Sequence, residues 1–115
     1  MSGATLEAPL ANARAALLAE RNEAGHWEGE LSSSALSTAT AVAALTLVDA
    51  VAHADFIQCG LSWLAENQND DGGWGDTTLS FSNISTTLLC WSVFGIAKAE
   101  SAHSKTVERA APRPD

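Results

Sequence analysis

The segment between Gly60 and Trp74 constrains the fold of this chain more than any other. It carries an apolar helical pattern up to Gln68, then two consecutive glycines, then Trp74 six residues after the glutamine. A helix needs only a glycine in order to end. An amide and an indole around that stop predict a joint between helices, because the amide can bond free backbone groups at helix ends while the indole packs over it. We therefore interpret Gln68 and Trp74 as a structural clamp at the surface.

The chain contains this pattern twice. A Leu-Ala-Glu tripeptide begins both copies, and the copies are offset by 46 residues at Leu18 and Leu64 but by 47 at Trp27 and Trp74. The first loop is therefore expected to be one residue shorter. A period of this length is typical of helical-hairpin repeats. We predict two repeats, at about residues 6–52 and 55–100, followed by a basic, Pro-containing tail over residues 101–115, with a short fifth helix over residues 104–111 as the alternative.

Apolar periodicity predicts four helices, at about residues 6–21, 33–52, 56–68 and 84–100. The first and third carry an apolar stripe on one side and are expected to be outer helices. The second and fourth are apolar nearly all round, which is typical of buried inner helices. Asp55 and Gln58 resemble a capping box at the start of the third helix. No segment alternates at period two, so the sequence predicts an all-α fold of two antiparallel helical hairpins.

The charge distribution excludes several classes of partner. The net charge is −8, and residues 22–97 contain no Lys or Arg but nine Asp or Glu residues. That surface would repel nucleic acid and disfavours anionic membranes. The uncharged runs 31–48 and 77–97 are rich in Ser and Thr, which favours buried helices over membrane spans. The first ten residues lack a basic region, which predicts no secretory signal and a cytoplasmic location.

The ionisable and metal-ligating residues show no spacing that is typical of a reactive site. The loop that contains Asp71 resembles the first half of a calcium loop, but Thr78 stands where the last ligand would be Glu. Two cysteines and three histidines form no close pair of the kind that zinc needs. We therefore expect no catalytic residue, no metal and no cofactor. Cys59 and Cys90 are interpreted as small buried hydrophobic residues. Trp91 is interpreted as a core residue, with the lining of a cavity as the alternative.

The stretch from Gly60 to Trp74 resembles the QW motif of the squalene-hopene and oxidosqualene cyclase superfamily. Cys59 stands where that motif usually has a basic residue. The matching residues are Gly60, Trp63, Leu64, Gln68, Gly72 and Trp74. In the earlier copy Gly25 and Trp27 match, while Leu17 stands at the aromatic position and Asn22 at the glutamine position.

The resemblance implies that the hairpins form an arc of an α/α toroid whose inner helices line an apolar cavity. It also implies polyprene cyclisation, in which a carboxylic acid protonates a double bond and aromatic faces stabilise the carbocations. The family carries that acid in an Asp-x-Asp-Asp motif, which this sequence lacks. The chain therefore resembles the N-terminal portion of a cyclase, or a short relative.

In that interpretation the chain is a cavity-forming, non-catalytic part of a cyclase that acts on squalene or a similar polyprene, and the chain alone is inactive. A non-enzymatic helical-repeat scaffold is the alternative. An open arc would expose an apolar edge, which predicts self-association and leaves peripheral membrane contact open.

Overall fold

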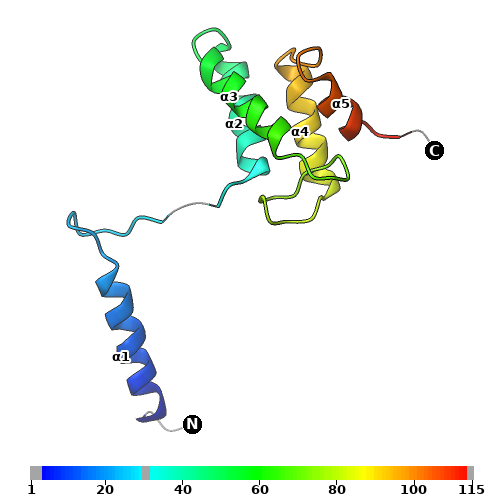
Figure 1. Cartoon of the computed structure of the whole chain (residues 1–115). Coiled ribbons are helices and arrows are strands. Elements are labelled where there is room, and N and C mark those ends of the chain that lie inside the picture. The colour runs from blue at the N-terminus through cyan, green and yellow to red at the C-terminus, as the bar shows by residue number, and fades with distance from the viewer. Residues whose placement is uncertain (1–3, 30–31, 114–115) are drawn as a thin grey trace. The chain divides into compact units, whose positions relative to one another are not determined.

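The computed structural model describes residues 4–29 and 32–113. Those residues form five α-helices and no strand, which confirms the predicted all-α fold. The chain divides into two compact units, residues 1–31 and 32–115. In chain order the helices are α1 (Ala4–Ala19), α2 (Ala35–Asp49), α3 (Ala54–Glu66), α4 (Ile84–Ile96) and α5 (Ser104–Ala110) (Figure 1).

The first unit consists of α1 and the turn that follows it. α1 ends at Ala19, two residues before its predicted end at Arg21. The N–H groups of Glu20 and Arg21 bond to carbonyls three residues back rather than four, at 3.3 Å each, which tightens the chain out of the α-helix. The leucines that were predicted to share one side of the helix, Leu10, Leu17 and Leu18, are exposed. A single helix cannot bury its own apolar side, so this unit has no core of its own.

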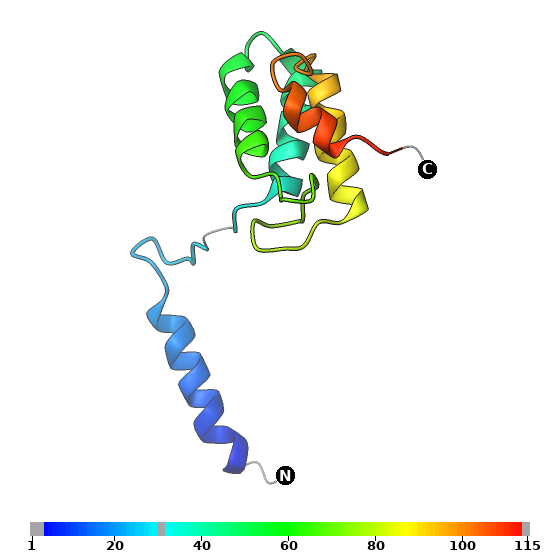
Figure 2. The same ribbon diagram turned by 45° about the vertical axis from the view of Figure 1, so that its right-hand side comes forward.

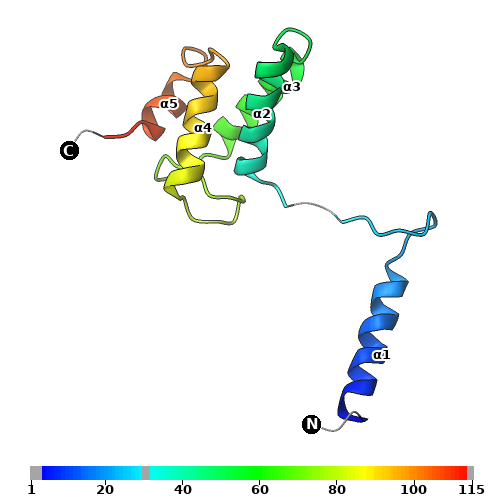
Figure 3. The same cartoon turned by 180° about the vertical axis from the view of Figure 1, so that it is seen from behind.

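The second unit has two layers of helices. Figure 1 and the view from behind in Figure 3 show α2 and α4 side by side in one layer, with α3 and α5 in the other. That the second and fourth helices are the inner ones of a toroid stays a prediction, and large apolar side chains of both helices are exposed rather than buried on most sides. The hairpins α2–α3 and α4–α5 lie next to each other (Figure 2). The core lies between the layers and includes Ala39, Val42, Leu61, Leu64, Trp74, Cys90, Val93 and Phe94.

A glycine sets the close approach of α3 to α2. A Cβ atom added to Gly60 would lie 2.5 Å from Cγ2 of Val42, which no real side chain could tolerate without movement. Thr38, one turn earlier on α2, lies 3.7 Å from the same position. Gly60 therefore matters for packing rather than for backbone freedom.

The helix starts differ from the prediction at α3. The Ser34 hydroxyl caps α2 by accepting a hydrogen bond of 3.1 Å from the Ser37 N–H. The predicted capping box of Asp55 and Gln58 is wrong, because α3 already begins at Ala54 and no side chain caps it. Asp55 instead lies in the first turn of α3, where its charge favours the helix dipole.

α4 ends four residues before the predicted end at Glu100. The chain reverses because Lys98 adopts a left-handed backbone conformation, with φ +56°. The Ala99 N–H then bonds back to the Phe94 carbonyl at 2.8 Å, which closes the helix end. Sequence periodicity did not indicate this stop, because the left-handed position is occupied by lysine rather than glycine.

The segment that was predicted to be a basic, Pro-containing tail contains α5. This short helix forms because Val107 and Ala110 pack against the core. Pro112 follows, where its ring cannot continue a helix. Residues 1–3 of the predicted first domain and 114–115 of the predicted tail lie outside the described residues. The predicted repeat boundaries at residues 52 and 55 stay a prediction.

The two uncharged runs form helices of ordinary length. α2 has 15 residues and α4 has 13. No helix within residues 4–29 and 32–113 is both long and apolar enough to cross a membrane.

Candidate functional site

The joint between α3 and α4 is built on a glycine turn. The Gly72 N–H bonds to the Asn69 carbonyl at 2.9 Å, and the Asn69 N–H bonds to the Gly73 carbonyl at 2.9 Å. Gly72 has φ +89°, a left-handed value that glycine adopts without strain. The Asp71 carboxylate accepts a hydrogen bond of 2.9 Å from the Gly73 N–H, which fixes the turn from inside.

Trp74 closes this joint from within the core. Its indole Nε1–H donates to the Leu64 carbonyl at 2.9 Å, on the last turn of α3. The side chain is only 1% exposed, and its ring stacks against Phe94 with centroids 6.4 Å apart. The prediction of a surface clamp is therefore wrong for Trp74, since the ring is a core residue. Its hydrogen bond satisfies a carbonyl at a helix end.

Gln68 joins the same loop to α5. Its Nε2 donates to the Gly72 carbonyl at 2.8 Å and to the Thr106 carbonyl at 3.0 Å. Its Oε1 accepts from Nη1 of Arg109 at 3.1 Å. The predicted role of Gln68, an amide that bonds backbone groups of two segments, is thus found in the structure. Its partner helix is α5, which the sequence offered only as the alternative to a tail.

Arg109 is a joint residue that sequence reasoning missed. Its Nη2 donates to the carbonyls of Asn69 at 3.3 Å and Asp70 at 3.0 Å. A Cβ atom on Gly72 would collide with the Arg109 carbonyl oxygen, so the loop and α5 meet backbone to backbone. The sequence carried a weak signal, since Arg109 is one of the few basic residues after residue 97.

The first copy of the pattern folds into the same joint. The indole Nε1–H of Trp27 donates to the Leu17 carbonyl at 2.6 Å, and the Asn22 N–H bonds to the His26 carbonyl at 2.9 Å. Gly25 has φ +88°, close to the +89° of its counterpart Gly72. Unlike Trp74, Trp27 is 47% exposed.

These bonds correct the alignment of the two copies. Each bonded pair in the first copy lies 47 residues before its counterpart, so the two loops have equal length and the prediction of a shorter first loop is wrong. Asn22 is the counterpart of Asn69, and Arg21 stands at the position of Gln68. The two Leu-Ala-Glu tripeptides are offset by 46 residues, so aligning them shifts the first copy by one residue from the structural alignment.

The remaining predicted motif residues lie on one turn of α3. Leu64 is buried in the core, and Trp63 is half-buried beside Gly60. The Trp63 carbonyl accepts hydrogen bonds from the backbone N–H of Asn67 at 3.0 Å and from its Nδ2 at 2.9 Å. Through its backbone carbonyl, Trp63 thus helps to close the end of α3.

Two carboxylates of the α3–α4 loop are held in the ionised form. A hydrogen bond of 2.7 Å from the Ser82 hydroxyl, with the Gly73 N–H second, lowers the pKa of Asp71. A hydrogen bond of 2.6 Å from the Thr86 hydroxyl, with the Asn83 amide second, lowers the pKa of Asp76. Neither group is therefore suited to donate a proton at neutral pH.

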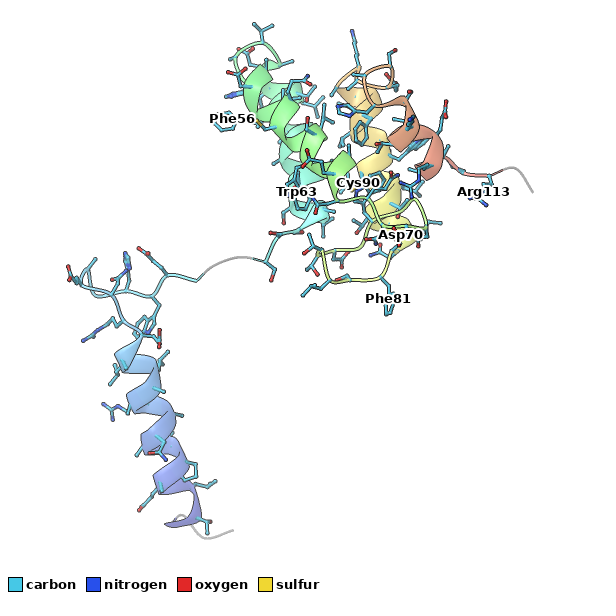
Figure 4. The ribbon with its side chains drawn as sticks, in the orientation of Figure 1. Phe56, Trp63, Asp70, Phe81, Cys90 and Arg113 are labelled. Carbon is cyan, nitrogen blue, oxygen red and sulfur yellow. The ribbon has the colours of Figure 1, made fainter. Side chains whose placement is uncertain are left out.

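The two cysteines differ. Cys90 is buried on α4, and burial raises the pKa of its thiol to about 12, so it stays protonated and unreactive. The predicted role of Cys90, which Figure 4 labels on α4, as a small buried hydrophobic residue is confirmed. Cys59 is exposed on α3, so the same prediction is wrong for that residue. No group of three or more His, Cys, Asp or Glu residues in the described part of the chain could hold a metal.

Trp91 lies half-buried on α4. It lines a pocket of about 300 Å³ together with Ser92, Ile96, Glu100 and Val107. Its indole nitrogen is buried and has no hydrogen-bond partner among the described residues. A buried unpaired donor costs about 1–3 kcal/mol, so this is a weak point of the packing. Whether Trp91 lines a substrate cavity stays a prediction.

One of the comparisons with known proteins gave a match. The family described as the squalene-hopene cyclase N-terminal domain matches residues 10–110. That range includes both tryptophan joints and all of helices α2 to α5. No curated protein and no solved structure gave a match to the chain. The all-α arc of an α/α toroid predicted from the sequence is the architecture of this family, and the chain belongs to the squalene-hopene cyclase family as its N-terminal domain.

Proposed function

We propose that this chain forms part of the wall of an apolar cavity that holds squalene or a similar polyprene during cyclisation. The family match supports a cyclase-type role. The substrate class is argued from the surface of the inner helices.

The layer formed by α2 and α4 carries the observation on which the proposal rests. α4 contains no charged residue, and α2 contains only Asp49, at its last position. Large apolar side chains are nevertheless exposed on both helices. A soluble domain that leaves an uncharged, apolar helix pair exposed is typical of a binding or packing surface. These side chains are Leu36, Leu47 and Val48 on α2 and Ile84, Leu88 and Ile96 on α4.

Photoaffinity labelling tests the proposal. The full chain would be irradiated with a polyprene that carries a diazirine, and the labelled peptides would be mapped by mass spectrometry. We expect label on α2 and α4 that excess squalene removes. Leu88→Glu should reduce the label, while Leu79→Glu, a change at a loop residue that is 97% exposed, should not. Label that is equal on α3, or that squalene does not displace, would contradict the proposal.

The alternative function is a non-enzymatic helical scaffold. Like the cavity-wall role, it needs no protonating acid, and the lowered pKa values of Asp71 and Asp76 in the α3–α4 loop suit neither group for that task. We therefore propose that the chain alone converts no squalene. Incubation with squalene and mass spectrometry of the products checks this. A scaffold would also take up no squalene-displaceable label, which separates it from the cavity-wall role.

We also propose that the chain associates with itself. The apolar side chains of α1 and of the inner helices remain exposed, which favours burial against another copy. Sedimentation velocity at several protein concentrations measures this directly. A purely monomeric chain would contradict it.

A further inference from the structure

α2 and α4 begin at the same end of their layer, where the α3–α4 loop runs past both helices (Figure 1). Each start has a polar cap. The Ser34 hydroxyl accepts from the Ser37 N–H at the start of α2, and the Asn83 side-chain oxygen accepts from the Thr86 N–H at 2.8 Å at the start of α4. Two neighbouring helices that point the same way place two positive dipole ends together, and a negative group beside both ends offsets their repulsion.

Asp76 is bonded to both of these starts. Its backbone carbonyl accepts a hydrogen bond of 2.6 Å from the Ser34 hydroxyl, at the start of α2. Its carboxylate accepts one of 2.9 Å from the Asn83 amide and one of 2.6 Å from the Thr86 hydroxyl, at the start of α4. Ser34 and Asn83 are the residues that cap the two helices. We call Asp76, Ser34, Asn83 and Thr86 the Asp76 bridge.

The backbone around Asp76 has little room to move. A Cβ atom on the preceding residue, Gly75, would collide with the carbonyl oxygen of Phe81, so the two sides of the loop touch. The Thr78 N–H adds a second bond to the segment before α2, since it donates to the Ser33 carbonyl at 3.2 Å. A closed loop that is bonded to both helix starts can transmit a displacement from one helix to the other.

The carboxylate of Asp76 meets a need that Asp71 does not. Thr86 is only 2% exposed, and a buried hydroxyl is costly to leave unpaired, so the carboxylate is required at this position. Asp71 lies in the same loop and also accepts two hydrogen bonds. Its donors, Ser82 and Gly73, belong to that loop and not to α2 or α4.

We propose that Asp76 is a positioning residue of the cavity wall, because its bridge fixes the spacing between the starts of α2 and α4. The exposed side chains of Leu36 and Leu88 each stand two residues beyond a bridge residue, so their spacing follows that of the helix starts. The bridge thereby sets the width of the apolar surface that the two helices present. This inference rests on the proposed function, since that width matters only to a wall that holds a polyprene.

Amide hydrogen exchange measured by NMR tests the bridge. Asp76→Ala removes bonds to α4 alone. It should nevertheless speed exchange of the Ser37 N–H on α2 by about two- to tenfold, because the freed loop no longer holds Ser34. Asp76→Asn keeps an oxygen that accepts hydrogen bonds and should recover most of the protection. Asp71→Ala is the matched control and should leave Ser37 unchanged. Exchange at Ser37 that stays the same in Asp76→Ala, or that rises equally in Asp71→Ala, would overturn the proposal.

Ser34→Ala tests the bridge from the other helix, and it does not depend on the folding of Asp76→Ala. The variant loses the bond to the Asp76 carbonyl, so exchange of the Thr86 N–H on α4 should become faster. The Ser37 N–H loses its cap directly in this variant and is therefore not the readout. Unchanged exchange at Thr86 would contradict a link between the two helix starts.

Photoaffinity labelling connects the bridge to the cavity wall. In Asp76→Ala the label from the diazirine polyprene should fall at Leu36 and Leu88 relative to Leu47 and Ile96, which lie at the far ends of the same helices. Faster Ser37 exchange with an unchanged labelling ratio would overturn the role of Asp76 in the wall. The exchange measurements contain no polyprene. A parent chain without squalene-displaceable label would therefore contradict the proposed function, while the bridge would still be judged by the exchange of Ser37 and Thr86.

Discussion

The indole Nε1–H of Trp74 donates to the backbone carbonyl of Leu64, ten residues earlier in the chain, at 2.9 Å. Trp27 makes the same bond to Leu17, also ten residues earlier, at 2.6 Å. In each case a tryptophan beyond a glycine turn reaches back to the last turn of the preceding helix. This bond, rather than the similarity of the letters, defines the repeat.

Trp74→Phe should lower the free energy of unfolding by about 2–4 kcal/mol. The change removes a hydrogen bond to a helix-end carbonyl and leaves a void beside Phe94. Urea denaturation measures it. Trp27→Phe is the matched control and should cost clearly less, because Trp27 is half exposed. Equal losses would contradict the placement of Trp74 in the core.

Gln68→Ala should loosen α5. Two hydrogen bonds to backbone carbonyls and one from Arg109 are lost, so α5 should open about 5- to 100-fold more often. Limited digestion with trypsin measures opening well, since residues 22–97 contain no Lys or Arg and cleavage near α5 begins at Lys98. Gln58→Ala, at an exposed position of α3, is the control. Unchanged cleavage at Lys105 would show that Gln68 does not hold α5.

Gly72→Ala should destabilise the fold by more than about 1 kcal/mol. The new methyl group would meet the Arg109 carbonyl, and alanine is strained at φ +89°. Gly29→Ala, where a Cβ atom meets nothing within 4 Å, should leave stability nearly unchanged. Thermal unfolding compares the two variants. Equal midpoints would mean that the loop does not seat against α5.

Acid should destabilise the fold partly through Asp76. Its pKa is lowered in the folded chain by the Thr86 hydroxyl and the Asn83 amide. The stability it contributes is fully present above its ordinary pKa of 3.8 and is lost as the pH falls through the lower folded value. Asp76→Asn should therefore lose less stability than the parent chain between neutral pH and pH values below 3.8. Denaturation curves with the same pH dependence for both proteins would be the contrary result.

Local pattern was enough to predict the all-α fold and the two glycine–tryptophan joints. These predictions depend on apolar residues at helical spacing and on glycines at helix ends. Both signals act over a few residues, so they can be recognised in a single sequence. The bonding role of Gln68 was also predicted, because an amide beside a helix end has few other partners.

Features that depend on distant contacts were missed, or were left as the less favoured alternative in the case of α5. α5 has seven residues and no buried stripe, so it is stable only because Val107 and Ala110 pack on the core. The exposure of Cys59 depends on which side of α3 faces α2, which Gly60 fixes. The alignment of the first joint with the second is defined by backbone hydrogen bonds, which matching of identical residues did not reproduce. Arg21 was therefore not identified as the counterpart of Gln68.

The equivalence of the two joints is tested most directly by NMR hydrogen exchange at the indole Nε1–H groups of the ¹⁵N-labelled chain. Trp74 and Trp27 donate to helix-end carbonyls, whereas the half-buried Trp63 has no such bond. We predict that both Trp74 and Trp27 exchange at least about tenfold more slowly than Trp63. Exchange of the Trp27 indole N–H as fast as that of Trp63 would show that the first copy of the pattern does not form its joint. The joint at Trp74 would then have no equivalent at Trp27.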